Sequence, residues 1–243
     1  MSAGRSAVVP PGGGGKAEAV RRMFTRIAGR YDLMNALMTG GRHHAWRRIA
    51  AHATIGAPPG PVLDLATGTG DLALAVRKAS TERFVAGVDF SEGMLREGRR
   101  KLDARGERRV GLAAGDALAL PFRDATFAAV VSAFLLRNLA DLPAGLAEMR
   151  RVTRPGGRVV ALEIVRPRLR GWDAIFALYF HRVVPAVGAA VARDRQAYTY
   201  LPQSVDGFVT PPELTALMRR VGLRDVRHRR LGLGTIALHV AIV

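Results

Sequence analysis

The chain has 243 residues, of which 49% are hydrophobic, and its formal net charge is +17. It contains no cysteine, which excludes disulfides, thiolate metal sites and thiol catalysis. Its basic residues are all arginine except Lys16, Lys78 and Lys101, and a charge of this size indicates either an anionic neighbour or a compositional bias toward arginine.

The first part of the chain divides into a leader and a helical region. Residues 1–16 contain four consecutive glycines and lack the apolar stretch of a secretory signal, so we predict a disordered leader before one domain at residues 17–243. Between residues 17 and 54 apolar side chains recur at three- and four-residue steps, which predicts a helical lid that Gly40-Gly41 divides. No uncharged apolar run is long enough to span a bilayer, so no membrane-spanning helix is expected.

Short apolar segments alternate with helical ones through the middle of the chain. Helices are predicted at residues 71–78, after a capping Ser91, and at residues 142–152, with a turn at residues 155–157. Five segments have the composition of buried strands: residues 62–66, 83–89, 110–114, 127–133 and 158–164. The alternation predicts an α/β fold with a Rossmann-like, doubly wound, mostly parallel sheet.

The C-terminal part should complete this sheet. A helical stretch covers residues 171–192, and a second helix is predicted at residues 212–221. Two strand-like segments follow at residues 226–231 and 235–243, which predicts a closing antiparallel hairpin.

The first predicted strand leads into a glycine turn, Asp64-Leu-Ala-Thr-Gly-Thr-Gly70. Gly68 and Gly70 let the backbone turn tightly and approach a ligand closely. Asp89 lies nineteen residues after Gly70, at the end of the second predicted strand. A carboxylate at this position can accept hydrogen bonds from both ribose hydroxyls of an adenosine. The third glycine of the dinucleotide fingerprint is missing, and Asp71 would repel a phosphate. An adenosine without phosphate fits better, and S-adenosylmethionine is such a ligand.

Asp116 follows the third strand and could accept a hydrogen bond from the adenine amino group. For Asp89 or Asp116 taken alone, the favoured interpretation is a cap on a helix or a turn. Because both follow strand ends beside the same glycine turn, we favour the interpretation that they bind the ligand.

Several longer motifs extend this interpretation beyond the glycine turn. They are FTRIAGRYDLMN at residues 24–35 with His43 and Trp46 after it, FLLRN at 134–138, PGGRVVALE at 155–163, YTYLPQS at 198–204 and IALH at 236–239. On these motifs the chain resembles the ubiquinone/menaquinone biosynthesis C-methyltransferases, a class I family dependent on S-adenosylmethionine, from about residue 20 to residue 239.

The resemblance implies S-adenosylmethionine as the cofactor. Family members often carry an acid where Thr25 stands and a glycine where Leu135 stands, and some carry a serine at Ala133, so these departures bear on the identity of the substrate. The residues that we expect to bind the cofactor are Asp64, Gly68, Thr69, Gly70, Asp89, Phe90, Asp116, Ala117 and Ala133.

The reaction implied by the resemblance is methyl transfer to a ring carbon of a polyprenylated quinol, foremost demethylmenaquinol. Such a carbon becomes nucleophilic when the neighbouring hydroxyl loses its proton, so the site needs a base or a stabiliser of the phenolate. Arg137 stays protonated and suits the second role, with Asn138 beside it, while the base remains open. Tyr31 is a further catalytic candidate, and the candidates for binding the substrate are Asp32, Asn35, His43, Tyr198 and Tyr200.

No metal site is expected among the six histidines. For His43, an exposed polar role beside His44 is an equal alternative, and for Arg137 the alternative is an exposed helix start.

An insoluble prenyl tail implies that a cytoplasmic enzyme meets its substrate at a membrane. We expect transient contact with an anionic surface on the inner face, although a lid that packs on the sheet is the favoured role for the same helix. The residues considered for this contact are Trp172, Phe176, Tyr179 and Phe180 beside Arg166, Arg168, Arg170 and Arg182. The sequence leaves a homodimer open.

Three other functions compete with this one. The chain could methylate another lipid or a phenolic small molecule, or be a non-catalytic subunit with the same fold. Its charge also suits an RNA-binding or RNA-methylating protein, but it has few aromatic residues for base stacking and no RNA-binding signature. We therefore expect no nucleic acid partner.

Overall fold

The computed structural model describes residues 14–168, 171–192 and 194–243. Its centre is a seven-stranded sheet in the order β3-β2-β1-β4-β5-β7-β6, in which β1 to β5 are parallel and β7 runs antiparallel to both of its neighbours. The strands are β1 (Val62–Leu65), β2 (Val85–Asp89), β3 (Val110–Ala114), β4 (Phe127–Ala133), β5 (Thr153–Ile164), β6 (Arg224–Leu231) and β7 (Ile236–Ile242). The predicted doubly wound sheet with a C-terminal hairpin is confirmed.

Both faces of the sheet are covered by helices, as its parallel strands require. In β1, Leu63 and Leu65 pack toward one face and Val62 packs toward the other. The first face is covered by α6 (Leu142–Val152) and α10 (Pro211–Arg220). The second is covered by α3 (Arg42–Ala53), α4 (Asp71–Ala79) and α5 (Glu92–Ala104), which Ser91 caps as predicted.

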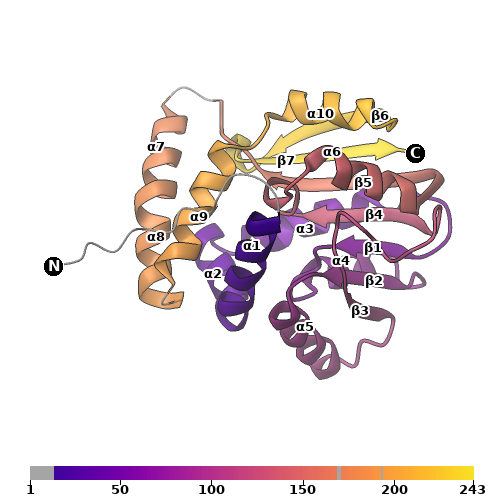
Figure 1. Cartoon of the computed structure of the whole chain (residues 1–243), viewed down its shortest axis with the longest axis horizontal. Helices are drawn as coiled ribbons and strands as arrows, with labels where there is room; N and C mark the ends of the chain where they lie inside the picture. Colours follow the sequence, from indigo (N-terminus) through magenta and orange to yellow (C-terminus); the bar gives the residue numbers. More distant parts are fainter. Residues whose placement is uncertain (1–13, 169–170, 193) are drawn as a thin grey trace.

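A third apolar core lies outside the sheet, in a group of helices that we call the helical cap. In Figure 1 the cap stands beside the end of the sheet where β7 begins, which is where the parallel strands finish. The cap is formed by α1 (Gly14–Ile27), η1 (Ala28–Arg30), α2 (Tyr31–Thr39), α7 (Trp172–Leu178), η3 (Tyr179–Val183), α8 (Val184–Val187), η4 (Gly188–Ala192) and α9 (Arg195–Asp206).

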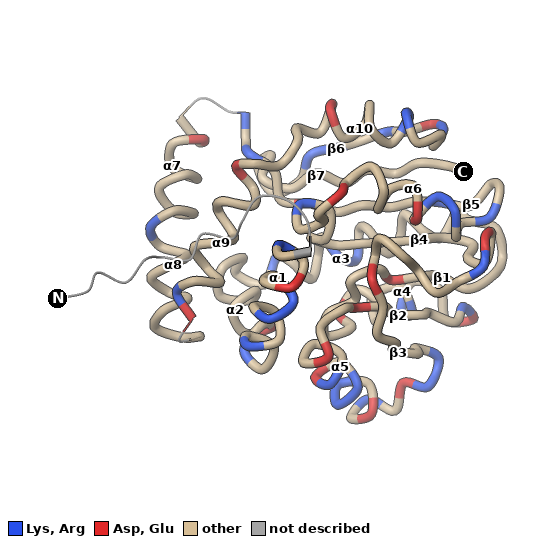
Figure 2. Tube along the Cα trace, in the orientation of Figure 1, with Lys and Arg blue, Asp and Glu red and all other residues tan. Residues whose placement is uncertain are grey.

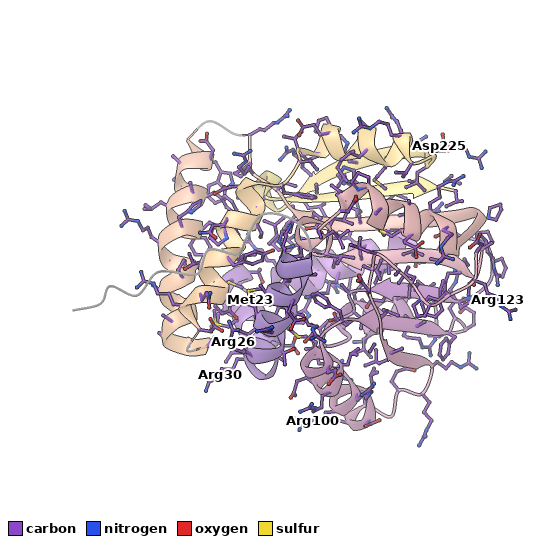
Figure 3. The ribbon with its side chains drawn as sticks, in the orientation of Figure 1. Met23, Arg26, Arg30, Arg100, Arg123 and Asp225 are labelled. Atoms are coloured by element: carbon purple, nitrogen blue, oxygen red, sulfur yellow. The ribbon has the colours of Figure 1, made fainter. Side chains whose placement is uncertain are left out.

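The N-terminal part of the cap is tied to the loops that follow two different strands. Lys16 Nζ donates to the Leu139 carbonyl at 2.9 Å after β4, and the hydroxyls of Thr25 and Ser91 lie 2.9 Å apart after β2. Figure 3 labels Met23, Arg26 and Arg30 along α1 and η1, between α7–α9 and α5. The cap therefore lies over the carboxyl ends of the strands.

Residues 1–13 of the predicted leader lie outside the described residues, and residues 14–16 form the first turn of α1. The turn predicted at residues 155–157 lies within β5, where Gly156 has a φ of +73°. The pairing of β4 with β5 jumps from Phe127–Thr153 to Ala129–Arg158. Residues 155–157 therefore bulge out of the ladder within β5 instead of preceding the strand.

Two features of the cap differ from the sequence prediction. Helix α9 was not predicted. In addition, the continuous helical stretch Trp172–Ala192 is 21 residues long, with a mean hydropathy of 1.6 in its most apolar window, and is therefore long and apolar enough to cross a membrane by length and composition alone. Asp173 and Arg182 interrupt it, which is why a search for uncharged runs did not find it.

Candidate active site

The glycine loop after β1 has the tight geometry that its sequence predicts. Gly68 and Gly70 adopt φ values of +57° and +82°, which favour glycine. Beneath the loop, Thr67 Oγ1 donates to Asp64 Oδ2 at 2.7 Å. Asp64 is fully buried, and this burial raises the pKa of its carboxyl to about 7. Asp64 therefore supports the loop from inside the sheet.

Asp89 connects the glycine loop to the end of β2. Its carboxylate accepts from the Gly68 amide at 2.9 Å and from the Ser91 amide at 2.8 Å. Burial raises the pKa of Asp89 to about 6, although both amides favour the charged form. A carboxylate held at this strand end can also accept from ribose hydroxyls, as predicted from its spacing.

The other predicted cofactor residues end the neighbouring strands. Asp116 follows β3, is exposed, and accepts from the Leu118 amide at 2.9 Å, so it does cap a turn. Ala117 comes next, Ala133 ends β4, and Phe90 is half-buried against the cap. Carboxylates after β2 and β3 suit a nucleoside that offers hydroxyls and an amino group, and they do not suit phosphate. These residues therefore fit S-adenosylmethionine.

Asp32 lies at the glycine loop and does not line the apolar cavity described below, contrary to the substrate role predicted for it. It accepts from Thr69 Oγ1 at 2.7 Å and from Lys101 Nζ at 2.5 Å. Lys101 also donates to Asp71 Oδ1 at 2.7 Å. Because residues on one side of α2 face the loop and the others face inward, the sequence pattern alone could not separate them.

A cavity of about 360 Å³ opens between the cap and the sheet. Its walls are mainly apolar and aromatic, including Phe24, Trp46 and Phe134. Six of the residues predicted from the sequence come together in this lining, which are Tyr31, Asn35, His43, Arg137, Tyr198 and Tyr200. Trp172, Phe176, Tyr179 and Phe180 also line the cavity. Their helical stretch packs mainly within the cap, so the prediction of a lid that packs on the sheet is wrong.

Arg137 is the buried cation of this cavity. Its Nη1 donates to Glu163 Oε2 at 3.0 Å and to the Phe134 carbonyl at 2.7 Å, and its guanidinium carbon lies 5.9 Å from the centre of the Phe134 ring. Glu163 is completely buried, which raises its pKa, while the adjacent guanidinium favours the charged carboxylate. The alternative of an exposed helix start for Arg137 is therefore wrong.

Asn138 reaches the cavity through a tyrosine. Its Oδ1 accepts from the Tyr200 hydroxyl at 3.1 Å, and its Nδ2 donates to the Phe134 carbonyl at 3.1 Å. Burial raises the pKa of both Tyr200 and Tyr198, so neither is a phenolate near neutral pH. Asn138 thus positions Tyr200.

His43 is buried and neutral. Desolvation and the nearby Arg47 lower its pKa to about 4. The single hydroxyl proton of Thr39 is donated to the Asn35 carbonyl at 2.7 Å, so at the 2.8 Å contact His43 Nδ1 is the donor. The predicted alternative of an exposed His43 is wrong, and the ring stacks against His44 with centroids 3.9 Å apart.

His43, His44 and Asp71 have ligand atoms within 4.8 Å of one another, close enough to hold a metal ion. The carboxylate of Asp71 already pairs with Lys101, and Arg47 Nη1 lies 3.7 Å from its second oxygen. Two neighbouring cations oppose a metal cation at this position.

Sequence reasoning assigned no role to Glu163, Phe134 or Arg47. Glu163 could have been found as a lone charge near the end of a long apolar strand, where burial requires a partner. Phe134 has a φ of +64°, unusual for a side chain of this size, and lies between Arg47 and Arg137, which only the fold reveals.

The profile of the ubiE/COQ5 methyltransferase family matches residues 14–243. A demethylmenaquinone methyltransferase of Roseiflexus castenholzii is 45% identical over 229 residues, which cover 93% of this chain and 94% of that protein. A ubiquinone/menaquinone biosynthesis C-methyltransferase UbiE of Geobacter sulfurreducens is 44% identical over 225 residues, covering 91% and 88%.

Solved structures with low sequence identity share the fold. A methyltransferase dependent on S-adenosylmethionine from Thermotoga maritima superposes with a TM-score of 0.61 at 17% identity, covering 91% of this chain and 98% of that one. The [4+2]-cyclase SpnF gives a TM-score of 0.69 at 16% identity, covering 98% of each chain. Because one neighbour is a cyclase, likeness at this level identifies the architecture and leaves the chemistry to the site.

Proposed function

The chain belongs to the ubiE/COQ5 methyltransferase family, and on that premise we propose that it methylates a ring carbon of demethylmenaquinol, a polyprenylated quinol. The enzyme uses S-adenosylmethionine, as the family and the carboxylates at the ends of β2 and β3 indicate. The proposed substrate is the one that its bacterial relatives are named for.

The observation that carries this proposal is the position of Arg137. It is a buried cation in the wall of a mainly apolar cavity, fixed by Glu163 and adjacent to the end of β4. An apolar cavity suits a quinol ring and the start of its tail, while one fixed cation suits the oxygen on which negative charge develops.

The bound cofactor supplies an electrophilic methyl group. The guanidinium of Arg137 holds the phenolate oxygen that forms when a quinol hydroxyl gives its proton to water, which concentrates electron density on the neighbouring ring carbon. That carbon gives up its own hydrogen as a proton after it has gained the methyl group. Asn138 keeps the Tyr200 hydroxyl in place beside it. The Tyr198 hydroxyl and the Asn35 amide are buried without a hydrogen-bond partner among the described residues, which supports a role in binding the ring oxygens.

The direct test is methylation of a demethylmenaquinol analogue with a short prenyl tail, followed by mass spectrometry. The wild-type protein should transfer the methyl group, and Arg137→Ala should lower kcat by about a hundredfold or more with an intact fold by circular dichroism. Arg123→Ala, on the far side of the molecule in Figure 3, is the matched control and should change nothing. Activity within a few-fold for Arg137→Ala would remove Arg137 from the mechanism.

We further propose that the Trp172–Ala192 stretch rests on an anionic bilayer. Its inward aromatics leave other apolar side chains facing solvent, with Ile175 60% exposed and Leu178 65% exposed. Figure 2 shows few charges along α7 and α8, while exposed Arg166, Arg168 and Arg182 flank them. Apolar anchors beside arginines suit such a surface. Of the arginines predicted here, Arg170 lies outside the described residues.

Sedimentation with liposomes tests the membrane contact. The protein should pellet with vesicles that contain anionic lipid, less strongly at high salt, and Leu178→Ser should weaken the pelleting. Leu33→Ser on α2, a residue of similar exposure, is the control. An equal distribution with and without lipid would contradict the proposal.

A further inference from the structure

Arg47 on α3 is a buried cation without a hydrogen bond of its own at Nη1. The residue is 6% exposed, and its nearest carboxylate oxygen, Asp71 Oδ2, lies 3.7 Å away, beyond hydrogen-bond reach. Two carboxylate oxygens near it are equally unpaired, Asp71 Oδ2 and Asp64 Oδ1. The positive charge of Arg47 opposes the burial that raises the pKa of the Asp64 carboxyl.

Buried polar atoms without a hydrogen bond are costly, and the Arg47–Asp71 ion pair at 3.7 Å supplies no hydrogen bond, so these atoms together require an explanation. Lys101, the other cation at this place, is already satisfied by Asp71 Oδ1 and Asp32. Apart from His43 Nε2, the atoms that remain here without a hydrogen-bond partner among the described residues are one guanidinium donor and two carboxylate acceptors. A ligand that offers a carboxylate and an ammonium group on neighbouring atoms would satisfy all three.

The order of the strands points to the same ligand. Asp116 follows β3, Asp89 follows β2 and the glycine loop follows β1, and these strands lie side by side. A nucleoside with adenine at the first and ribose at the second must direct its remaining end toward the glycine loop and β4. Arg47 lies there, with its guanidinium carbon 5.6 Å from the centre of the Phe134 ring.

We propose that Arg47 binds the α-carboxylate of the amino-acid end of S-adenosylmethionine, while Asp71 and Asp64 accept hydrogen bonds from its α-ammonium group. The inference rests on the cofactor of the proposed function, and not on the identity of the quinol. It gives α3 a role in binding the cofactor as well as in covering the sheet.

Calorimetry with two nucleosides isolates this contact. S-Adenosylhomocysteine carries the amino-acid end, and 5′-methylthioadenosine lacks it. Arg47→Met should weaken the binding of S-adenosylhomocysteine by about tenfold or more, as expected for a lost charge-assisted pair. It should change the affinity for 5′-methylthioadenosine less than about twofold. Arg48→Met removes the same charge from the exposed side of the same helix and should leave both affinities unchanged.

Two results with Arg47→Met would overturn the proposal. One is unchanged affinity for S-adenosylhomocysteine. The other is an equal loss for both nucleosides, because Arg47 would then shape the crevice as a whole. Loss of S-adenosylhomocysteine binding by the unvaried protein on chelation with EDTA would assign the cluster to a metal ion and also overturn it.

A second comparison does not depend on the folding of Arg47→Met. The unvaried protein should bind the carboxyl methyl ester of S-adenosylhomocysteine about tenfold or more weakly than the free acid, and Arg47→Lys should retain part of that preference. Equal affinity for ester and acid would contradict the proposal. If the unvaried protein bound neither nucleoside, the cofactor assignment itself would fail, which is a different result.

Discussion

The cofactor crevice and the apolar cavity both include residues of α2 but are built in opposite ways. The crevice is made by loops at the ends of parallel strands, where Asp89 and Asp64 are held by backbone amides and a hydroxyl. The cavity is made by cap helices from distant parts of the sequence, with aromatic walls and a single fixed ion pair, Arg137–Glu163. The first site is specified by short-range sequence, and the second by how helices pack.

The strongest test of this contrast is the buried ion pair. Glu163→Gln keeps the volume of the side chain but leaves Arg137 as an uncompensated buried charge, so the free energy of unfolding should fall by about 3–5 kcal/mol in urea titrations. Glu97→Gln breaks the exposed Arg100–Glu97 pair and should cost less than about 1 kcal/mol. Similar losses for both variants would show that burial is not what matters.

The crevice should respond through cofactor affinity. Asp89→Ala removes the predicted acceptor of the ribose hydroxyls. It should weaken the binding of S-adenosylhomocysteine by at least about tenfold in calorimetry. Phe176→Ala, in the wall of the cavity, should leave this affinity within about twofold. If Asp89→Ala bound as tightly as wild type, the ribose assignment would be wrong.

Protonation of buried histidines should weaken the fold at acid pH. His239 is fully buried, its Nε2 donates to the Pro211 carbonyl at 3.0 Å, and desolvation lowers its pKa to about 4. Because the folded pKa is below the unfolded value, its stabilising contribution is present above about pH 6.5 and is lost as the pH falls toward 4.

Between pH 7 and pH 5 the contribution of His239 should fall by about 1–2 kcal/mol, measured as the difference between the wild-type protein and His239→Gln in urea unfolding at each pH. The difference is needed because the raised pKa values of Asp64 and Asp89 change the total stability in the opposite direction. His239→Gln, in the sheet, and His43→Gln, at the cavity, should each reduce the dependence of the unfolding free energy on pH. A slope that neither variant changes would assign the acid sensitivity to other groups.

The smallest effect is expected at the aromatic wall. Phe176 is half-buried and stacks on Phe180 with ring centroids 4.8 Å apart. Phe176→Ala should raise KM for a prenylated quinol by about three- to tenfold, with kcat nearly unchanged, because it removes apolar contact without touching Arg137. Phe84→Ala, which truncates a ring that is 48% exposed, is the control. A loss in kcat instead would place Phe176 nearer to the reacting atoms.

The same contrast explains what could be predicted from the sequence. The strands and the glycine loop follow from apolar alternation and from the spacing of Gly68, Gly70 and Asp89, and these features were predicted correctly. Helix α9 was missed because Pro202 lies inside it, although its buried Tyr198, Pro202 and Val205 recur at helical spacing. The sequence marked Tyr198 as a substrate candidate, but its burial follows from the packing of the cap.

The role of a charged residue was the hardest feature to predict. Arg47 and Arg48 are adjacent and chemically identical, yet one is buried over the glycine loop and the other faces water. The rotation of about 100° per residue around α3 decides between them, and this rotation depends on how α3 packs on α4. The sequence of α3 alone therefore does not determine which of the two arginines is buried.

Helix α2 has a consequence for the thermodynamics of the enzyme. Within its nine residues, Tyr31 and Asn35 line the cavity while Asp32 bonds to Thr69 in the glycine loop. A ligand that displaces this short helix at one site therefore also moves residues of the other site. By linkage, whatever factor the nucleoside imposes on the affinity for the quinol, the quinol imposes the same factor in return.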